Sequence, residues 1–194
     1  MPYTYRKYRF ILLLLLTAIL VRAACAEETI KSKYFNIHLS GSVDKIQLLE
    51  KLKADCFLRM RVGLPEQESK GSRNDSAMVG DTLDAMYLEV SDIIDMHLYS
   101  LNINVEILPD KAHLANVLKE NPAEDKDTVS FYNYDKNTIY ISYEDMNAVM
   151  LSHQMAHAIA SHYFAAPPPA RIQELLASYA ENGIRKDLRR AIQK

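Results

Sequence analysis

Two histidines four residues apart, set in an apolar helical pattern, constrain the fold of this chain more than any other feature. His153 and His157 lie in a stretch whose apolar residues recur every three or four positions, from Met146 to Phe164. On a helix, residues at i and i+4 share a face, with their Cβ atoms about 5–6 Å apart. That spacing suits two imidazoles that bind one metal ion. Because a buried polar group without a partner costs about 1–3 kcal/mol, the pattern predicts either a metal site or two core histidines with hydrogen-bond partners.

A glutamate on the next predicted helix favours the metal site. Prolines at 167–169 end the histidine helix, because proline lacks the backbone N–H and disfavours helical backbone at the residue before it. Glu174 follows in a helix that begins after this corner. Two histidines and a carboxylate form a known set of zinc ligands, so His153, His157 and Glu174 are the predicted zinc ligands. His162 is excluded, because on a regular helix it lies about 140° round the axis from His157.

The combined pattern resembles a known family of zinc peptidases. It is similar to H-E-x-x-H followed on a later helix by E-x-x-A-x-Y, the signature of the gluzincin branch of the zincins, and the chain looks most like their peptidase-MA-type domains over about residues 128–182. In that family the glutamate after the first histidine is the general base, and this chain has Gln154 there. An amide cannot accept a proton at neutral pH, and general-base catalysis is worth about 10²–10⁴-fold. The resemblance therefore implies a zinc site with impaired catalysis.

Three further roles follow from the resemblance alone. Some gluzincins place an acidic residue four positions after the glutamate ligand, where it supports a histidine, and Ser178 occupies that position here. Tyr163 and Tyr179 are expected to be core aromatics, and the alternative role for either is to stabilise an oxyanion. The strand Thr138–Ser142 corresponds to the edge strand that pairs with extended substrate, so a peptide or protein ligand is expected along it by strand addition.

Hydrophobic periodicity predicts a single α+β domain. Its small mixed sheet is expected to pack against the metal-site helix and the helix that follows it. The predicted strands are residues 34–39, 104–108, 128–134 and 138–142; the predicted helices are 43–61, 82–98, 111–120, 144–164 and the segment from 170 onwards, broken at Gly183. Ser142 and Asp145 are expected to cap helix 144–164, and Asp81 or Thr82 to cap helix 82–98. Residues 64–80 form a predicted polar loop.

The first 26 residues have the charge and hydropathy order of a secretory signal peptide. A basic start precedes the apolar run 10–21, and small residues at 24 and 26 suit cleavage. The prediction is an exported domain, periplasmic or secreted, spanning 27–194, with an uncleaved membrane anchor or a lipoprotein cut before Cys25 as alternatives. Loss of residues 1–26 removes four cations and no acids and leaves 19 basic against 25 acidic residues, a net charge of −6 that does not favour nucleic-acid binding. Cys56, then the single cysteine, is expected to be buried.

Three functions fit these observations. The first is a zinc-binding, peptidase-like domain that has lost hydrolysis because of Gln154 and binds peptide or protein. The second is an active zinc peptidase in which another group replaces the missing base. The third is a metal-free structural or interaction domain. Metal content separates the third function from the others, and cleavage that a chelator abolishes separates the second from the first.

Overall fold

The computed structural model describes residues 27–62, 74–119 and 128–193. The predicted signal peptide at 1–26, and residues 64–73 of the predicted loop at 64–80, lie outside these described residues. None of the helices in the described part of the chain has both the length and the apolar character that crossing a bilayer requires.

One five-stranded mixed sheet organises the chain, in the strand order β1-β2-β3-β5-β4. The strands are β1 (Glu28–Lys31), β2 (Phe35–Leu39), β3 (Ile103–Leu108), β4 (Ser130–Asn133) and β5 (Thr138–Ser142). The three central strands β2, β3 and β5 run parallel, whereas β1 and β4 pair antiparallel at the two edges. The prediction of one α+β domain with a small mixed sheet is therefore confirmed.

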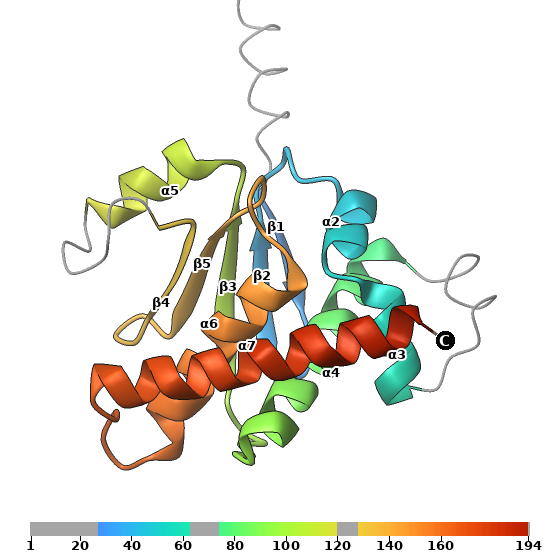
Figure 1. Ribbon diagram of the computed structural model, residues 1–194. Coiled ribbons are helices and arrows are strands. Elements are labelled where there is room, and N and C mark those ends of the chain that lie inside the picture. The colour runs from blue at the N-terminus through green and yellow to red at the C-terminus, as the bar shows by residue number, and fades with distance from the viewer. Residues whose placement is uncertain (1–26, 63–73, 120–127, 194) are drawn as a thin grey trace, which may run out of the picture.

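Helices cover the two faces of the sheet unequally (Figure 1). The helices are α2 (Lys45–Lys51), α3 (Ala54–Val62), α4 (Asp75–Ile94), α5 (Lys111–Leu118), α6 (Ala148–Tyr163) and α7 (Ala170–Ile192). Helix α5 packs with β4 and β5 on one face, through Leu114, Leu118, Phe131 and Tyr140. The other helices form the larger layer, in which α4 contacts α2, α3, α6 and α7.

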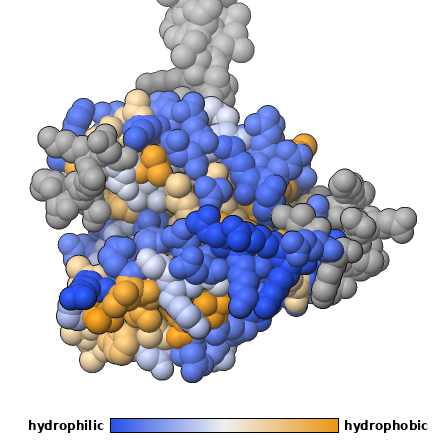
Figure 2. Space-filling view, viewed as in Figure 1, coloured by the Kyte–Doolittle hydropathy of each residue, from blue (hydrophilic) through white to orange (hydrophobic). Residues whose placement is uncertain are grey.

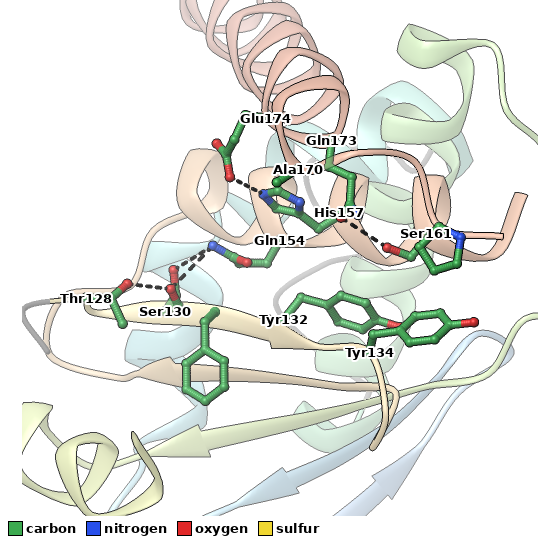
Figure 3. Close-up of a pocket in the computed structure, with 12 residues that line it drawn as sticks. Thr128, Ser130, Tyr132, Tyr134, Gln154, His157, Ser161, Ala170, Gln173 and Glu174 are labelled. Carbon is green, nitrogen blue, oxygen red and sulfur yellow. Dashed lines mark hydrogen bonds and ion pairs between the residues drawn. The ribbon is translucent and has the colours of Figure 1, made fainter. Parts of the chain in front are cut away.

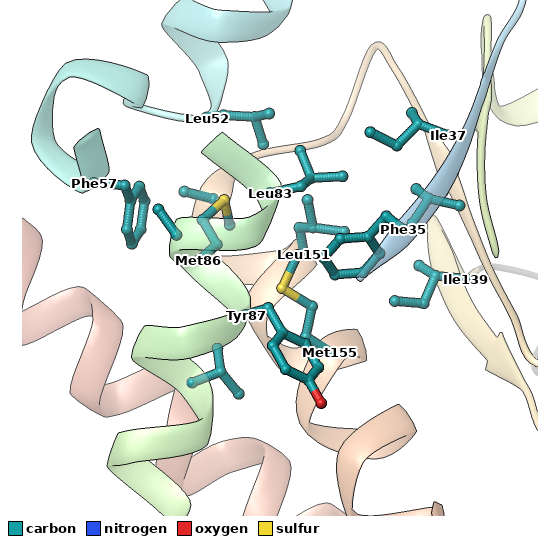
Figure 4. Close-up of a cluster of buried hydrophobic side chains, with 14 of the residues drawn as sticks. Phe35, Ile37, Leu52, Phe57, Leu83, Met86, Tyr87, Ile139, Leu151 and Met155 are labelled. Carbon is teal, nitrogen blue, oxygen red and sulfur yellow. The ribbon is translucent and has the colours of Figure 1, made fainter. Parts of the chain in front are cut away.

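The main core lies between that layer and the sheet (Figure 4). Strand β2 alternates buried and half-buried residues, so that Phe35 and Ile37 point towards the helices. Leu83 and Met86 of α4 meet them there, and Met155 of α6 reaches the same cluster. Burying one such side chain stabilises a fold by about 1.5–3 kcal/mol. The face of α6 that carries Met155 is thus fixed to the core, and this fixes where the histidines on its flank point.

Several predicted boundaries were wrong for local reasons. Strand β1 was missed, because ETIK alone has too few residues to show a period. The predicted helix 43–61 is two helices, divided where Lys53 takes a left-handed φ of 55°. Helix α4 starts inside the predicted loop at 64–80, because Asn74, and neither Asp81 nor Thr82, accepts the capping hydrogen bond from Ser76 N.

Candidate metal and ligand site

Helix α6 begins at Ala148, after Asn147 caps it with a hydrogen bond from Met150 N to its side chain. The predicted cap, Ser142, instead donates to the Asp145 carboxylate at 2.9 Å in the turn before the helix. Asparagine at an N-cap satisfies one of the amide groups that a helix start leaves unpaired. The helix then runs sixteen residues without interruption, which places His153 and His157 one turn apart in its middle.

Helix α7 packs closely against α6 through small side chains. Ala156 and Ala160 of α6 and Ala177 and Ala180 of α7 are all fully buried. Alanines at such a contact let two helix axes approach, so that side chains beside the contact can meet. Ala170, at the start of α7, is by contrast exposed.

The three predicted ligands converge. His153 Nε2 lies 3.2 Å from His157 Nε2. One carboxylate oxygen of Glu174 is 3.2 Å from His157 Nε2, and the other is 3.6 Å from His153 Nε2. One ligand atom from each residue falls within 4.8 Å of the other two, and among the described residues no other group of three such side chains does so. Both imidazoles are mostly buried, with side chains only 20% and 13% exposed.

The donor set and its spacing fit zinc. Tetrahedral zinc has ligand bonds of about 2.0–2.1 Å, which places neighbouring ligand atoms about 3.3 Å apart. His157 Nε2 lies 3.2 Å from both His153 Nε2 and one Glu174 oxygen, which is close to that value, and the 3.6 Å separation from His153 Nε2 belongs to the other oxygen of the same carboxylate. Glu174 is the exposed member, with 61% of its side chain open to solvent. Three protein ligands around an open side are the arrangement of zinc sites that leave one position for another molecule.

Burial keeps His157 neutral at neutral pH. The pKa of His157 lies below its ordinary value, first because burial disfavours the charged ring and next because His153 is close. The Glu174 carboxylate and the Gln173 side chain oppose this effect. Metal ions bind the neutral imidazole, so the lowered pKa favours metal binding over protonation.

A fourth side chain supports His153. Oε2 of Glu181 lies 3.2 Å from Nδ1 of His153, and Oε1 of the same carboxylate accepts a hydrogen bond of 2.6 Å from Arg185. The sequence prediction placed this support at Ser178, which is exposed and bonds through its backbone carbonyl to Asn182. Glu181 was missed, although its spacing of seven residues from Glu174, two helical turns, was visible in the sequence.

Gln154, which follows the first histidine of the cluster, forms hydrogen bonds with the sheet (Figure 3). Its Nε2 lies 3.2 Å from Ser130 Oγ and 3.4 Å from the Ser130 carbonyl oxygen. Thr128 Oγ1 donates to that same carbonyl at 2.8 Å. Gln154 is 8% exposed, so these contacts satisfy an amide that burial would otherwise penalise.

The edge strand beside the cluster differs from the one predicted. Thr138–Ser142, expected to be an edge strand, is β5, and it pairs with β3 on one side and β4 on the other. All five of its residues are buried. Peptide cannot add to a strand that is already paired on both sides. The edge next to α6 is instead β4, and a cavity of about 470 Å³ lies between β4 and the helices, lined by Ser130, Tyr132, Tyr134, Gln154, His157 and Glu174 among others (Figure 3).

The other aromatic and imidazole groups lie apart from the cluster. Tyr163 and Tyr179 are 46% and 62% exposed, which contradicts a core place, and neither lines the cavity. Apolar surface gathers at the corner between α6 and α7 (Figure 2), where Tyr163 and Phe164 are exposed. His162 does not join the cluster; its Nε2 lies 2.8 Å from the hydroxyl of Tyr132. Burial lowers the pKa of His162 below its ordinary value.

Comparison of the chain with family models, with curated proteins and with solved structures found no significant match.

Proposed function

We propose that this domain binds zinc through His153, His157 and Glu174 and binds peptide in the adjoining cavity without hydrolysing it. The observation that carries the proposal is the convergence of one donor atom from each of these three residues within 4.8 Å of one another, with His157 Nε2 3.2 Å from both a His153 nitrogen and a Glu174 oxygen. The resemblance of the sequence pattern to gluzincin peptidases supports it. When bound, zinc supplies a positive charge and an acceptor of electron pairs at the edge of the cavity.

The chain's own residues prepare that site for binding. Glu181 holds the ring of His153, and burial keeps His157 neutral, so both Nε2 atoms are available to a metal. Gln154 holds α6 against β4. Because its Nε2 points to Ser130, and because an amide is no base at neutral pH, Gln154 does not remove a proton from an attacking water.

Zinc binding is tested on the purified domain with metal removed by chelator. Titration with zinc should show one site and should raise the melting temperature, since a metal bound by the folded state alone stabilises it by mass action. Glu174→Ala should weaken binding strongly. Asp187→Ala is the matched control, because it removes a carboxylate from the same helix that pairs instead with Arg190. A melting temperature that ignores both zinc and chelator would refute the metal site and favour a metal-free interaction domain.

The absence of hydrolysis is tested on the same preparation. Zinc-loaded wild-type protein should leave an unfolded protein substrate intact. Cleavage that disappears with chelator would instead make the domain an active peptidase with another base.

Export belongs to the proposal through the predicted signal peptide. Protein recovered from the native host should begin at Glu27. Terminal sequencing that finds Met1, or a lipid on Cys25, would contradict cleavage after residue 26.

A further inference from the structure

The outer edge of β4 carries the backbone groups of two residues. Ser142 N donates to the Val129 carbonyl at 3.0 Å, so the residues paired through hydrogen bonds with β5 are Val129 and every second residue after it. Ser130 and Tyr132 alternate with these, and their N–H and C=O groups point away from β5. These two residues are where an added strand could bond to this sheet.

The edge is closed at Ser130. Its carbonyl already accepts from Thr128 Oγ1 and from Gln154 Nε2, which occupies both lone pairs of that oxygen. The residue as a whole is 6% exposed, beneath α6. A second strand cannot pair there unless Gln154 and Thr128 move away.

The edge is open at Tyr132. Among the residues that the structure describes, none forms a hydrogen bond with the outward backbone groups of Tyr132. Its hydroxyl is held, by a hydrogen bond of 2.9 Å to the Asn137 side chain and by His162 at 2.8 Å. The ring is thereby fixed in the cavity wall beside Tyr134, which is 47% exposed (Figure 3). The edge therefore offers hydrogen bonds to one residue of a ligand.

We infer that the site binds the C-terminal end of a peptide, with its free carboxylate at the metal cluster. This inference rests on the proposed function. One residue bonds to both backbone groups of Tyr132 when the two chains are antiparallel. An antiparallel ligand runs towards its C-terminus from Tyr132 to Ser130, where the edge is closed. Its chain must therefore end beside Gln154, His157 and Glu174.

With zinc bound, the charges at the cavity favour the orientation that places the peptide's C-terminus at the metal. Among the described residues that line the cavity, none is lysine or arginine, and Glu174 contributes a negative charge. A bound metal supplies the positive charge that a terminal carboxylate needs. The opposite orientation would place a terminal ammonium group against the metal, which is electrostatically unfavourable. Selection of a free carboxylate should therefore depend on zinc.

The experiment uses zinc-loaded wild-type protein and four peptide pools, varied at the same position. One pool of N-acetylated tripeptides has a free C-terminal carboxylate, and its matched N-acetylated control has a C-terminal amide. A third pool carries three further residues beyond the same C-terminus and ends in an amide. A fourth has a free N-terminus and a C-terminal amide. Binding is measured by fluorescence polarisation with and without chelator.

The free-carboxylate pool should bind at least about tenfold more tightly than the other three. The reason is that hydrogen bonds to charged groups are roughly twice as strong as those between neutral groups. Removing zinc with chelator should abolish the difference in affinity. Equal zinc-dependent binding of the first three pools would overturn the inference and leave the proposed function standing. Preference for the free N-terminus would overturn it likewise. Binding of no pool, in protein that takes up zinc, would refute peptide binding and the inference with it.

Discussion

Glu181 and His153 face each other at 3.2 Å, on the side of the imidazole ring opposite Glu174. The two glutamates stand two turns apart on α7, so one helix supplies both a candidate metal ligand and the carboxylate that orients its neighbour. A proton on Nδ1 of His153, donated to Glu181, leaves Nε2 available to the metal.

Replacing Glu181 with glutamine should weaken zinc binding by about 10–100-fold, the usual effect of losing such an outer partner. Glu181→Gln keeps the size of the side chain but removes its charge. Ser178→Ala, on the same helix, should have no effect, because its side chain is exposed. Zinc affinity by competition with a metal indicator measures both variants. Equal affinity of Glu181→Gln and wild type would show that the carboxylate does not support His153.

Replacing Gln154 with glutamate should destabilise the protein without creating a peptidase. The new carboxylate would stand where Nε2 now approaches the Ser130 carbonyl at 3.4 Å, so two acceptors would face each other. We expect a loss of about 1–3 kcal/mol in the free energy of unfolding at pH 7. The loss should shrink at acid pH, where a protonated carboxyl can donate to Ser130.

Denaturant unfolding of Gln154→Glu and wild type at pH 7 and pH 4.5 measures this effect. Chelator-sensitive cleavage by the variant alone would contradict the expectation and show a peptidase disabled only at this position.

Gly183 marks a close approach between α7 and α4. A Cβ at this position would lie 2.8 Å from both Cδ1 and Cγ2 of Ile93. Gly183→Ala should gain about 1 kcal/mol of helix propensity but should lose about 1–3 kcal/mol by overpacking. We therefore expect a net loss of stability. In the double variant with Ile93→Ala, Gly183→Ala should instead raise stability, because the clash is gone. Thermal unfolding of wild type, the two single variants and the double variant measures this coupling. If the two substitutions changed stability additively, the contact between the two positions would be contradicted.

The ionised carboxyl of Glu106 should lower the free energy of unfolding at neutral pH. Burial raises the pKa of this carboxyl above its ordinary value, with Glu27 adding to the shift and His38 opposing it. Between the unfolded and folded pKa values the folded state binds more protons, so stability falls as pH rises through that window. Glu106→Gln should remove this fall and raise the melting temperature at pH 7 by about 1–2 °C, a small effect because Glu106 is only half-buried. Glu89→Gln, which breaks an ion pair with Arg61, should lower it instead.

The sequence predicted the elements with long periodic patterns and the three residues that meet at the cluster. Those predictions depend on local rules, since one helical turn aligns His153 with His157 and prolines 167–169 enforce the corner before Glu174. Gly183, by contrast, does not break α7, because Ile93 of α4 packs over a position that has no side chain. The propensity of glycine is a weak effect that tertiary contact overrides.

The features that sequence reasoning missed are set by distant parts of the chain. Strand order decides that β4, and not Thr138–Ser142, is the edge, and hydropathy cannot reveal this order. Gln154 looks like a vacant catalytic position until Ser130, 24 residues earlier, is placed beside it. The support from Glu181 depends on how α7 is rotated against α6, which packing at Ala177 and Ala180 determines.

The hydrogen bond between Gln154 and Ser130 also bears on edge-to-edge pairing between copies of this chain. An uncovered sheet edge is a template for another copy of the same chain. At one edge β1 is four residues long and carries Glu28, which is paired with Lys45. At the other, β4 is equally short, and α6 covers half of its outward backbone through Gln154. Each edge is thus short and partly covered, which disfavours pairing with another copy. Under the inference above, the glutamine that covers β4 against another copy is also the residue that sets where a bound peptide would end.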